Sequence, residues 1–179
     1  MRATVCLPTY NERANLEPML ARLGEVLRDG DRVLVIDDGS PDGTGELADR
    51  LAGELGFVDV LHRPRKEGLG PAYLAGFRRA LDDGAELVLE MDCDFSHDPA
   101  DVPRLIAAAE AGADLVLGSR YVSGGSIPNW GLARRAISLG GNVYAQIFLL
   151  DIHLDGLVDF RRDEDAGERS VPALGLIER

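Results

Sequence analysis

Between Ala3 and Leu117 the sequence alternates short continuous apolar runs with longer stretches in which apolar residues recur at helical spacing. A short continuous run is typical of a strand buried on both faces, and helical spacing is typical of a helix packed against such strands. The alternation therefore predicts an α/β fold with a mostly parallel sheet, helices on both faces and right-handed crossovers. The expected strands are Ala3–Leu7, Val33–Ile36, Val58–Leu61, Leu87–Met91 and Asp114–Leu117.

Helices are expected between these strands, with boundaries predicted from capping and turn residues. Asn15 is the predicted N-cap of the first helix, and Pro71 is predicted to occupy the first position of the third. Pro8 is expected to end the first strand. The expected helices begin near Leu16, Leu47, Gly70, Pro99 and Leu132, and the last of them runs to Leu150.

The charge balance excludes whole classes of partner. The chain of 179 residues carries a formal net charge of -12 and is 45% hydrophobic, so a packed interior under an acidic surface is expected. A nucleic-acid-binding protein would show a basic face, and an acidic surface does not adhere broadly to an anionic membrane. We therefore expect no nucleic-acid partner, although Arg134 and Arg135 form a local basic patch.

Three further features favour a cytoplasmic location. Arg2 is the only early charge and the apolar stretch after it ends at Pro8, which is unlike a secretory signal. No apolar run is long enough to span a bilayer, so no transmembrane segment is expected. Cys6 and Cys93 match no zinc-binding spacing, and we expect both to be free, buried side chains in a reducing compartment.

Polar residues follow every predicted strand at its carboxyl end, which is the edge where open parallel sheets bind ligands. Carboxylates, hydroxyls, an amide and basic groups all converge there, and solubility alone does not require such a concentration. The sequence therefore predicts a ligand site at this edge. The residues concerned are Pro8–Glu12, Asp37–Ser40, His62–Lys66, Asp92–Asp94 and Ser119–Arg120.

The pair Asp92 and Asp94 indicates the type of ligand. Two carboxylates across a tight turn, with Asp38 nearby, repel one another and any phosphate unless a cation lies between them. Mg²⁺ and Mn²⁺ commonly take one or two protein carboxylates and complete their shell with water and substrate phosphates. We therefore expect a metal–diphosphate site. The alternative is that these acids only cap the next helix, a role that Ser96 or Asp98 can fill instead.

Five segments together resemble a known family. They are "LPTYNE" (Leu7–Glu12), "VIDDGSPDGT" (Val35–Thr44), "KEGLGPAYLAGF" (Lys66–Phe77), "MDCDFSHDP" (Met91–Pro99) and "GSRYVSGG" (Gly118–Gly125). In this order they resemble inverting, nucleotide-sugar-dependent glycosyltransferases of GT-A fold, and more narrowly the polyprenol-phosphate (dolichol-phosphate) mannosyltransferases. The "DCDFSHDP" and "GSRYVSGG" segments, followed by "ARRAIS", carry the narrower resemblance.

The resemblance implies a role for individual residues. Pro8, Tyr10, Glu12, Asp37 and Asp38 would hold the nucleoside of GDP-mannose. Asp92 would contact the nucleotide-sugar and, with Asp94 and Ser96, the Mg²⁺ or Mn²⁺ ion. The acceptor would be a polyprenyl phosphate at the cytoplasmic face of the membrane, where the enzyme would be peripheral, with a membrane partner protein as an option. Its phosphate would be held by Arg120, Arg134 and Ser138, which makes Asp92, Asp94, Arg120 and Arg134 the candidate catalytic residues.

The family pattern breaks after Leu150, which sets the expected domain organisation. A strand and a T-G-G-F-type turn usually follow, but residues 151–179 contain neither the threonine nor the paired glycines. We therefore expect a nucleotide-sugar-binding domain over residues 1–150 and a divergent, weakly ordered tail over residues 151–179.

Alternatives to mannose transfer remain open from the sequence. One is a related transferase that uses another nucleotide-sugar or acceptor, and another is a non-catalytic nucleotide-sugar-binding protein with a shortened C-terminus. A nucleotidyltransferase would need a glycine-rich basic loop directly after the first strand, and "PTYNERAN" does not provide one.

Overall fold

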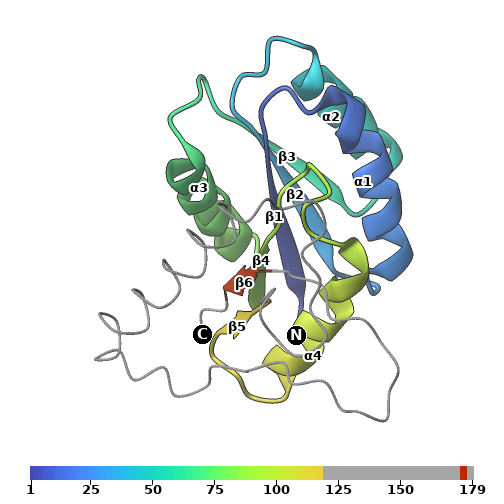
Figure 1. Cartoon of the computed structure of the whole chain (residues 1–179), viewed down its shortest axis with the longest axis vertical. Coiled ribbons are helices and arrows are strands. Elements are labelled where there is room, and N and C mark those ends of the chain that lie inside the picture. Colours follow the sequence, from blue (N-terminus) through green and yellow to red (C-terminus); the bar gives the residue numbers. More distant parts are fainter. Residues whose placement is uncertain (119–173, 177–179) are drawn as a thin grey trace, which may run out of the picture.

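The computed structural model describes residues 1–118 and 174–176, in which strands and helices alternate (Figure 1). The parallel strands are β1 (Ala3–Thr9), β2 (Arg32–Asp37), β3 (Val58–His62) and β4 (Leu87–Glu90), and the short strands β5 (Val116–Leu117) and β6 (Leu174–Leu176) complete the sheet. The helices are α1 (Arg13–Val26), α2 (Thr44–Glu54), α3 (Leu69–Asp82) and α4 (Val102–Glu110), the last preceded by a 3₁₀ turn, η1 (Pro99–Asp101).

The strand order in the sheet is β3-β2-β1-β4-β6-β5. Strands β1 to β4 are parallel, with Cys6 of β1 lying between Leu34 of β2 and Glu90 of β4, and β6 is antiparallel to both β4 and β5. Central β1 therefore has a neighbour on each side, which explains why it is buried almost throughout. This mostly parallel sheet with flanking helices confirms the predicted fold class.

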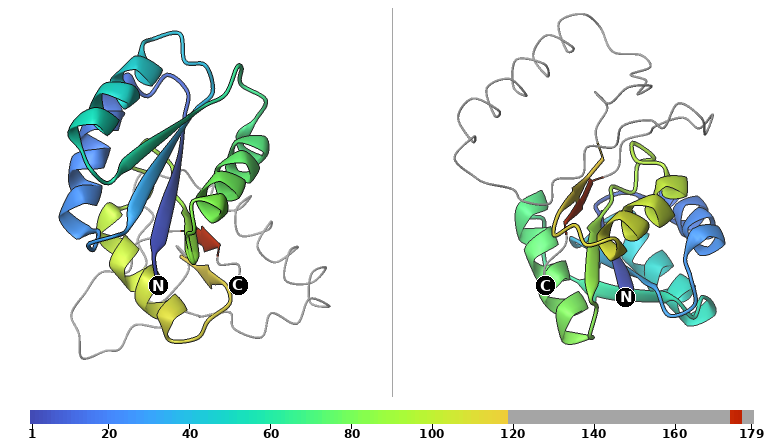
Figure 2. Two further views of the ribbon diagram at one scale, coloured as in Figure 1. Left: turned by 180° about the vertical axis from the view of Figure 1, so that it is seen from behind. Right: turned by 90° about the horizontal axis from the view of Figure 1, so that it is seen from below.

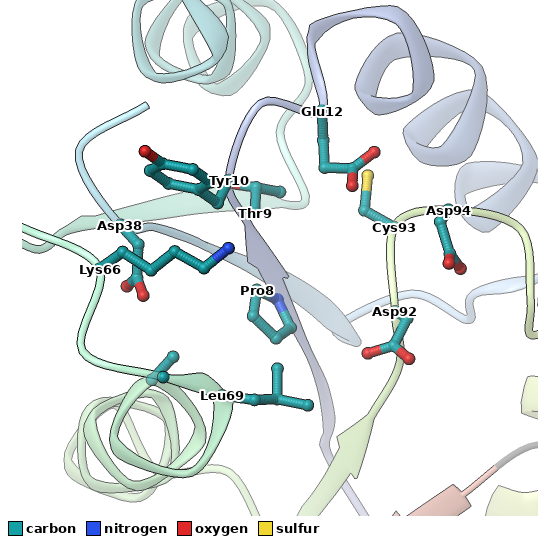
Figure 3. A pocket seen from close by; sticks show the side chains of 12 residues that line it. Pro8, Thr9, Tyr10, Glu12, Asp38, Lys66, Leu69, Asp92, Cys93 and Asp94 are labelled. Carbon is teal, nitrogen blue, oxygen red and sulfur yellow. The ribbon is translucent and has the colours of Figure 1, made fainter. Parts of the chain in front are cut away.

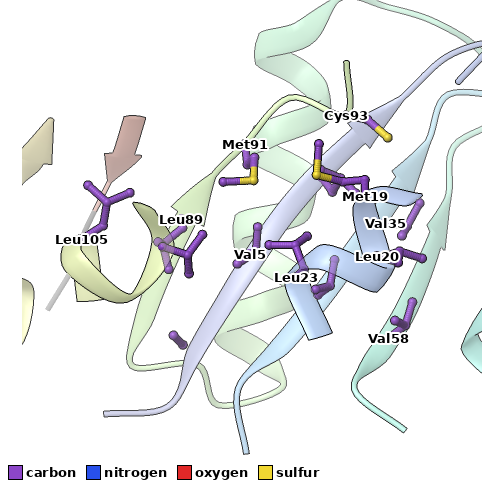
Figure 4. Packing of buried hydrophobic residues seen from close by; sticks show 14 of the residues in the cluster. Val5, Met19, Leu20, Leu23, Val35, Val58, Leu89, Met91, Cys93 and Leu105 are labelled. Atoms are coloured by element: carbon purple, nitrogen blue, oxygen red, sulfur yellow. The ribbon is translucent and has the colours of Figure 1, made fainter. Parts of the chain in front are cut away.

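Residues alternate between the two faces of the sheet, and each face has its own hydrophobic cluster. In β1, Val5 and Leu7 face the larger cluster, under α1, α2 and α4, where Leu20 and Leu105 are among the buried side chains (Figure 4). Cys6 faces the smaller cluster under α3. Among the described helices, α3 lies on one side of the sheet and α1, α2 and α4 lie on the other (Figure 2). Alternation of this kind is what a strand buried on both faces requires.

The predicted end of the first strand and the predicted start of the first helix were wrong. Strand β1 continues through Pro8 to Thr9, because Pro8 lies beyond the last β1–β4 pair, Cys6 with Glu90, and its missing N–H removes no hydrogen bond to β4. Helix α1 begins at Arg13, and Asn15 is not its N-cap: its side chain instead donates to Glu12 Oε2 at 2.7 Å.

Other boundaries moved less. Helix α3 begins at Leu69, so Pro71 is its third residue rather than its first, and β4 ends at Glu90, one residue before the predicted end. The segment predicted as a helix from Pro99 begins as the 3₁₀ turn η1.

Most of the predicted C-terminal part, from Leu132 onward, lies outside the described residues. Leu174–Leu176, within the segment that we expected to be a weakly ordered tail, forms β6; the rest of that segment and the helix predicted from Leu132 to Leu150 lie outside the described part. Among the helices that are described, none is both long and apolar enough to cross a membrane.

Candidate functional site

A pocket lies where β1, β2 and β4 end and α3 begins, as the parallel sheet predicts (Figure 3). Segments far apart in the sequence meet here because the strands that carry them are neighbours in the sheet. The pocket therefore collects one polar loop from each strand. Its lining consists of Pro8, Thr9, Tyr10, Glu12, Asp38, Lys66, Gly68, Leu69, Ala72, Asp92, Cys93 and Asp94.

Asp92 follows β4 directly and is held at two points. Its Oδ1 accepts a hydrogen bond of 3.2 Å from the hydroxyl of Tyr73 in α3, and its backbone N–H donates to Nδ1 of His97 at 3.1 Å. Within the described part of the chain, Oδ2 accepts no hydrogen bond. Asp92 thus presents one restrained oxygen and one uncommitted oxygen at the pocket.

Asp94 lies on the exposed side of the same turn and is kept ionised. Burial alone would raise its pKa, but hydrogen bonds from the hydroxyl and backbone N–H of Ser96, together with His97, leave the pKa below its ordinary value. The N–H of Ser96 donates to Oδ1 at 2.9 Å. Phe95, between Asp94 and Ser96 in the chain, has a φ of 61°, a left-handed conformation that costs a bulky residue about 1–2 kcal/mol. The turn therefore maintains an exposed anion at a local cost in strain.

The two aspartates suit a metal whose shell is completed by a ligand. In residues 1–118 and 174–176, no three His, Cys, Asp or Glu side chains converge to form a metal site by themselves. Mg²⁺ and Mn²⁺ do not need such a set, because substrate phosphates and water supply the remaining oxygens. Asp92 and Asp94 both line the pocket and fit this role; Ser96 does not line it and contacts Asp94 instead.

Asp38, at the end of β2, is the buried anion of the opposite wall. Only 8% of its side chain is exposed, and Nη1 of Arg63 lies 2.5 Å from its Oδ1. Arg63 is itself nearly buried and also pairs with Glu67 at 3.2 Å. Burying a carboxylate is costly unless it is paired, and the contact with Arg63 supplies the partner that Asp38 needs here.

Asp37, predicted beside Asp38, does not line the pocket. One of its oxygens accepts from the backbone N–H of Ser40 at 3.1 Å and the other from the Ser40 hydroxyl at 2.5 Å. The side chain therefore closes the turn that places Asp38.

The remaining wall comes from β1 and the loop before α3. Tyr10 is 36% exposed, and Nζ of Lys66 lies 4.2 Å from the centre of its ring. Figure 3 shows Lys66 reaching across the pocket between Asp38 and Pro8. Glu12 points into the pocket from the far side and is oriented by the hydrogen bond from Asn15.

The two cysteines are free and buried, as predicted. Cys93 lies between the two aspartates of the turn, and burial followed by the charges of Glu12, Asp94 and Asp92 raises its pKa to about 12. Burial, with Glu90, also raises the pKa of Cys6 to about 12. A thiol that stays protonated is a poor nucleophile and metal ligand, so neither residue adds chemistry to the site.

The structure therefore brings most of the predicted residues together and adds three. Pro8, Tyr10, Glu12, Asp38, Asp92 and Asp94 share one pocket, whereas Arg120, Arg134 and Ser138 lie outside the described residues. Arg63 and Lys66 were expected at this edge but without a role in the site. Tyr73 carried no signal, because in sequence it belongs to the apolar stripe of α3.

Comparison with known proteins finds a matching family and similar curated relatives. Residues 4–162 match the family described as Glycosyl transferase family 2. Undecaprenyl-phosphate mannosyltransferase of Micrococcus luteus is 50% identical over 149 residues, which are 83% of this chain and 60% of that protein. Polyprenol monophosphomannose synthase of Mycolicibacterium smegmatis is 48% identical over 171 residues, 95% of this chain and 63% of that protein. The chain thus spans about three fifths of the length of these curated relatives.

A likeness to solved structures supports the fold. The crystal structure of glucosyl-3-phosphoglycerate synthase from Mycobacterium tuberculosis, in complex with Mn²⁺, uridine diphosphate and glucosyl-3-phosphoglycerate, superposes with a TM-score of 0.59 and 23% sequence identity. The match covers 87% of this chain and 53% of that one.

Proposed function

Since the chain belongs to glycosyl transferase family 2, we propose that it transfers mannose from GDP-mannose to a polyprenyl phosphate, with inversion at the sugar carbon and with Mg²⁺ or Mn²⁺ as cofactor. The observation that carries the proposal is the pocket that Asp38, Asp92 and Asp94 line together at the carboxyl ends of the strands. The names of the two relatives, at 50% and 48% identity, support mannose as the sugar and a polyprenyl phosphate as the acceptor.

The nucleoside would bind between Tyr10 and Asp38. The partly exposed Tyr10 ring offers a face on which a base can stack. Arg63 occupies one oxygen of Asp38, so a donor on the base or ribose would find the other. Pro8 and Glu12 would complete this side of the pocket. Such a division gives a buried, charge-assisted contact at one end of the donor, which fixes its orientation.

The diphosphate would lie at the other end, toward the turn after β4. Asp92 and Asp94 would hold the metal, which when bound neutralises the diphosphate and stabilises the charge that develops on the departing GDP. Ser96 keeps Asp94 ionised, and Tyr73 restrains Oδ1 of Asp92 so that Oδ2 remains available. The contribution of the protein is thus preorganised charge rather than a reactive side chain.

The transfer itself needs no general base. A phosphate monoester has a second pKa of about 6, so an acceptor oxygen is already anionic near neutral pH. That oxygen forms a bond to the anomeric carbon while the bond from this carbon to the β-phosphate oxygen of GDP breaks, and a single displacement inverts the configuration. Arg120, Arg134 and Ser138 would position the acceptor phosphate, because arginine forks match phosphate oxygens.

The remaining parts of the proposal concern the setting of the reaction. The acceptor is a lipid, so we expect the enzyme to work peripherally at the cytoplasmic face of a membrane, with or without a membrane partner protein. Residues 1–150 would form the nucleotide-sugar-binding domain, followed by the divergent segment 151–179.

Calorimetry and a transfer assay test the proposal together. GDP-mannose, GDP-glucose and UDP-glucose are titrated with and without Mn²⁺, and transfer to a short polyprenyl phosphate is followed by product analysis. We expect GDP-mannose to bind most tightly, only with metal, and to give the inverted mannosyl phosphate. Tighter binding of UDP-glucose would point to a related transferase instead. Binding without transfer would favour a non-catalytic nucleotide-sugar-binding protein.

The variant Arg120→Ala separates donor from acceptor in the same assays. It should retain the affinity of the wild type for GDP-mannose and lose transfer. A loss of donor binding would show that Arg120 does not act on the acceptor.

A further inference from the structure

Lys66 is the only lysine in the sequence; the other basic residues of the total of 19 lysines and arginines are all arginines. It lies in the loop between β3 and α3 and lines the pocket together with four carboxylates, those of Glu12, Asp38, Asp92 and Asp94. The single lysine is therefore the basic side chain in the described lining of an otherwise acidic pocket.

The ammonium of Lys66 is not committed to any of these carboxylates. Among the described residues it forms no ion pair, whereas the neighbouring Arg63 and Arg65 both pair with Glu67. Its described contact is with the ring of Tyr10, at 4.2 Å from the centre. A cation over an aromatic face is worth about 0.5–1 kcal/mol at an exposed site, so this contact is readily exchanged for a stronger one.

A bound nucleotide-sugar would offer the ammonium of Lys66 a stronger contact. If the base stacks on this face of Tyr10, the ammonium of Lys66 must leave it. The diphosphate then adds a doubly charged partner to the carboxylates already in the pocket, and the flexible four-carbon stem of lysine allows the ammonium to reach it. Gly68, two residues later, has a φ of 104°, a backbone conformation that residues other than glycine rarely adopt.

We propose that Lys66 is a donor-binding residue that leaves the Tyr10 ring and pairs with the diphosphate when the nucleotide binds. This inference rests on the proposed function, because it requires a nucleoside diphosphate in the pocket. It adds a second positive group to the diphosphate site, on the wall opposite the turn that carries Asp92 and Asp94.

Because the chain has one lysine, an amine-selective reagent reports on this residue directly. The full chain is acetylated at a low reagent concentration, and the rates at Lys66 and at the amino group of Met1 are followed by peptide mass spectrometry. The Met1 amine, 3.3 Å from Glu110, serves as the internal control. With GDP and Mn²⁺ we expect acetylation of Lys66 to slow by about tenfold, GMP to protect less, and the rate at Met1 to stay unchanged.

Paired variants test the same inference by affinity. Lys66→Met should weaken GDP binding by about tenfold while leaving GMP binding nearly unchanged, and Lys66→Arg should recover most of the loss. Arg65→Met is the matched control, since its side chain is 77% exposed, pairs with Glu67 and does not line the pocket.

The outcomes separate the two levels of the proposal. If GDP binds the wild-type chain but neither protects Lys66 nor loses affinity in Lys66→Met, the inference about Lys66 is wrong and the proposed function stands. If calorimetry shows no GDP binding to the wild type, both are wrong.

Discussion

The hydroxyl of Tyr73 donates a 3.2 Å hydrogen bond to Oδ1 of Asp92, and so joins α3 to the turn after β4. Tyr73 is 8% exposed and its ring packs against that of Phe77 at 5.9 Å between centres, which leaves the hydroxyl little freedom. Burial, together with the charge of Asp92, raises the pKa of Tyr73, so the hydroxyl remains a donor across the working pH range. The aspartate is thereby oriented by a residue that belongs to the core.

Tyr73→Phe should therefore weaken metal binding without unfolding the protein. The ring packing survives, but Asp92 loses the contact that restrains Oδ1, and loss of such a supporting contact costs about tenfold in metal affinity. The measurement is the Mn²⁺ concentration that gives half-maximal GDP binding. Phe77→Leu is the control, because it touches Tyr73 but not Asp92; it should lower the melting temperature and leave the Mn²⁺ dependence alone. An unchanged Mn²⁺ requirement in Tyr73→Phe would contradict the prediction.

The Arg63–Asp38 pair is predicted to carry both stability and donor binding. Arg63→Met leaves Asp38 buried without its partner, which typically costs about 3–5 kcal/mol in the free energy of unfolding. Urea denaturation measures the loss, and GDP binding should weaken in the same variant. Glu67→Gln removes the more exposed partner of Arg63 and should cost much less. Similar losses in the two variants would show that the buried pair has no special role.

The carboxylate of Asp31 is predicted to make stability fall in acid. It is 4% exposed and accepts from Ala3 N–H at 2.9 Å and from Arg28 Nε at 2.9 Å. Burial alone would raise its pKa, but the hydrogen bonds from Arg28 and Ala3 leave the pKa below its ordinary value. A lowered pKa in the folded state means that the stabilisation is complete above the unfolded pKa, about 3.9, and is lost as the pH falls through the folded value.

Asp31→Asn should accordingly lower the free energy of unfolding by about 2 kcal/mol at pH 7. The difference from the wild type should shrink as the pH falls below about 4. Denaturant titrations across this pH range, with the exposed neighbour in Asp29→Asn as control, provide the check. A difference between Asp31→Asn and the wild type that does not vary with pH would argue against a charged Asp31.

Features repeated along the chain were predictable from the sequence, and contacts between distant segments were not. Strand–helix alternation predicted the parallel sheet. Because such sheets bind ligands at the carboxyl ends of their strands, the sequence also predicted that Asp38 and Asp92 lie at one edge. Asp92 and Asp94 could be recognised as candidate site residues, because placing an acid directly after a buried strand is energetically costly. Tyr73 gave no such signal, since its hydroxyl acts across the sheet edge while its ring follows the apolar pattern of α3.

The boundary errors have a similar origin. A proline normally ends a central strand, and only the pairing register shows that Pro8 lies where β4 has already ended. Asparagine is a common N-cap residue, but the side-chain amide of Asn15 donates a hydrogen bond to Glu12. Strand β6 lies in a segment without periodicity, and its position depends on pairing with β4 and β5. For Pro8 and β6 the deciding partner is a strand remote in sequence, whereas for Asn15 it is Glu12, three residues away.

The most direct test of the central claim is anomalous diffraction from Mn²⁺ in crystals grown with GDP. We predict one peak beside Asp92 and Asp94, adjacent to the diphosphate of the nucleotide, and its disappearance in Asp94→Asn crystals. A peak elsewhere, a peak that survives in Asp94→Asn, or GDP bound near Arg28 and Asp31 at the opposite rim of the sheet would contradict the account.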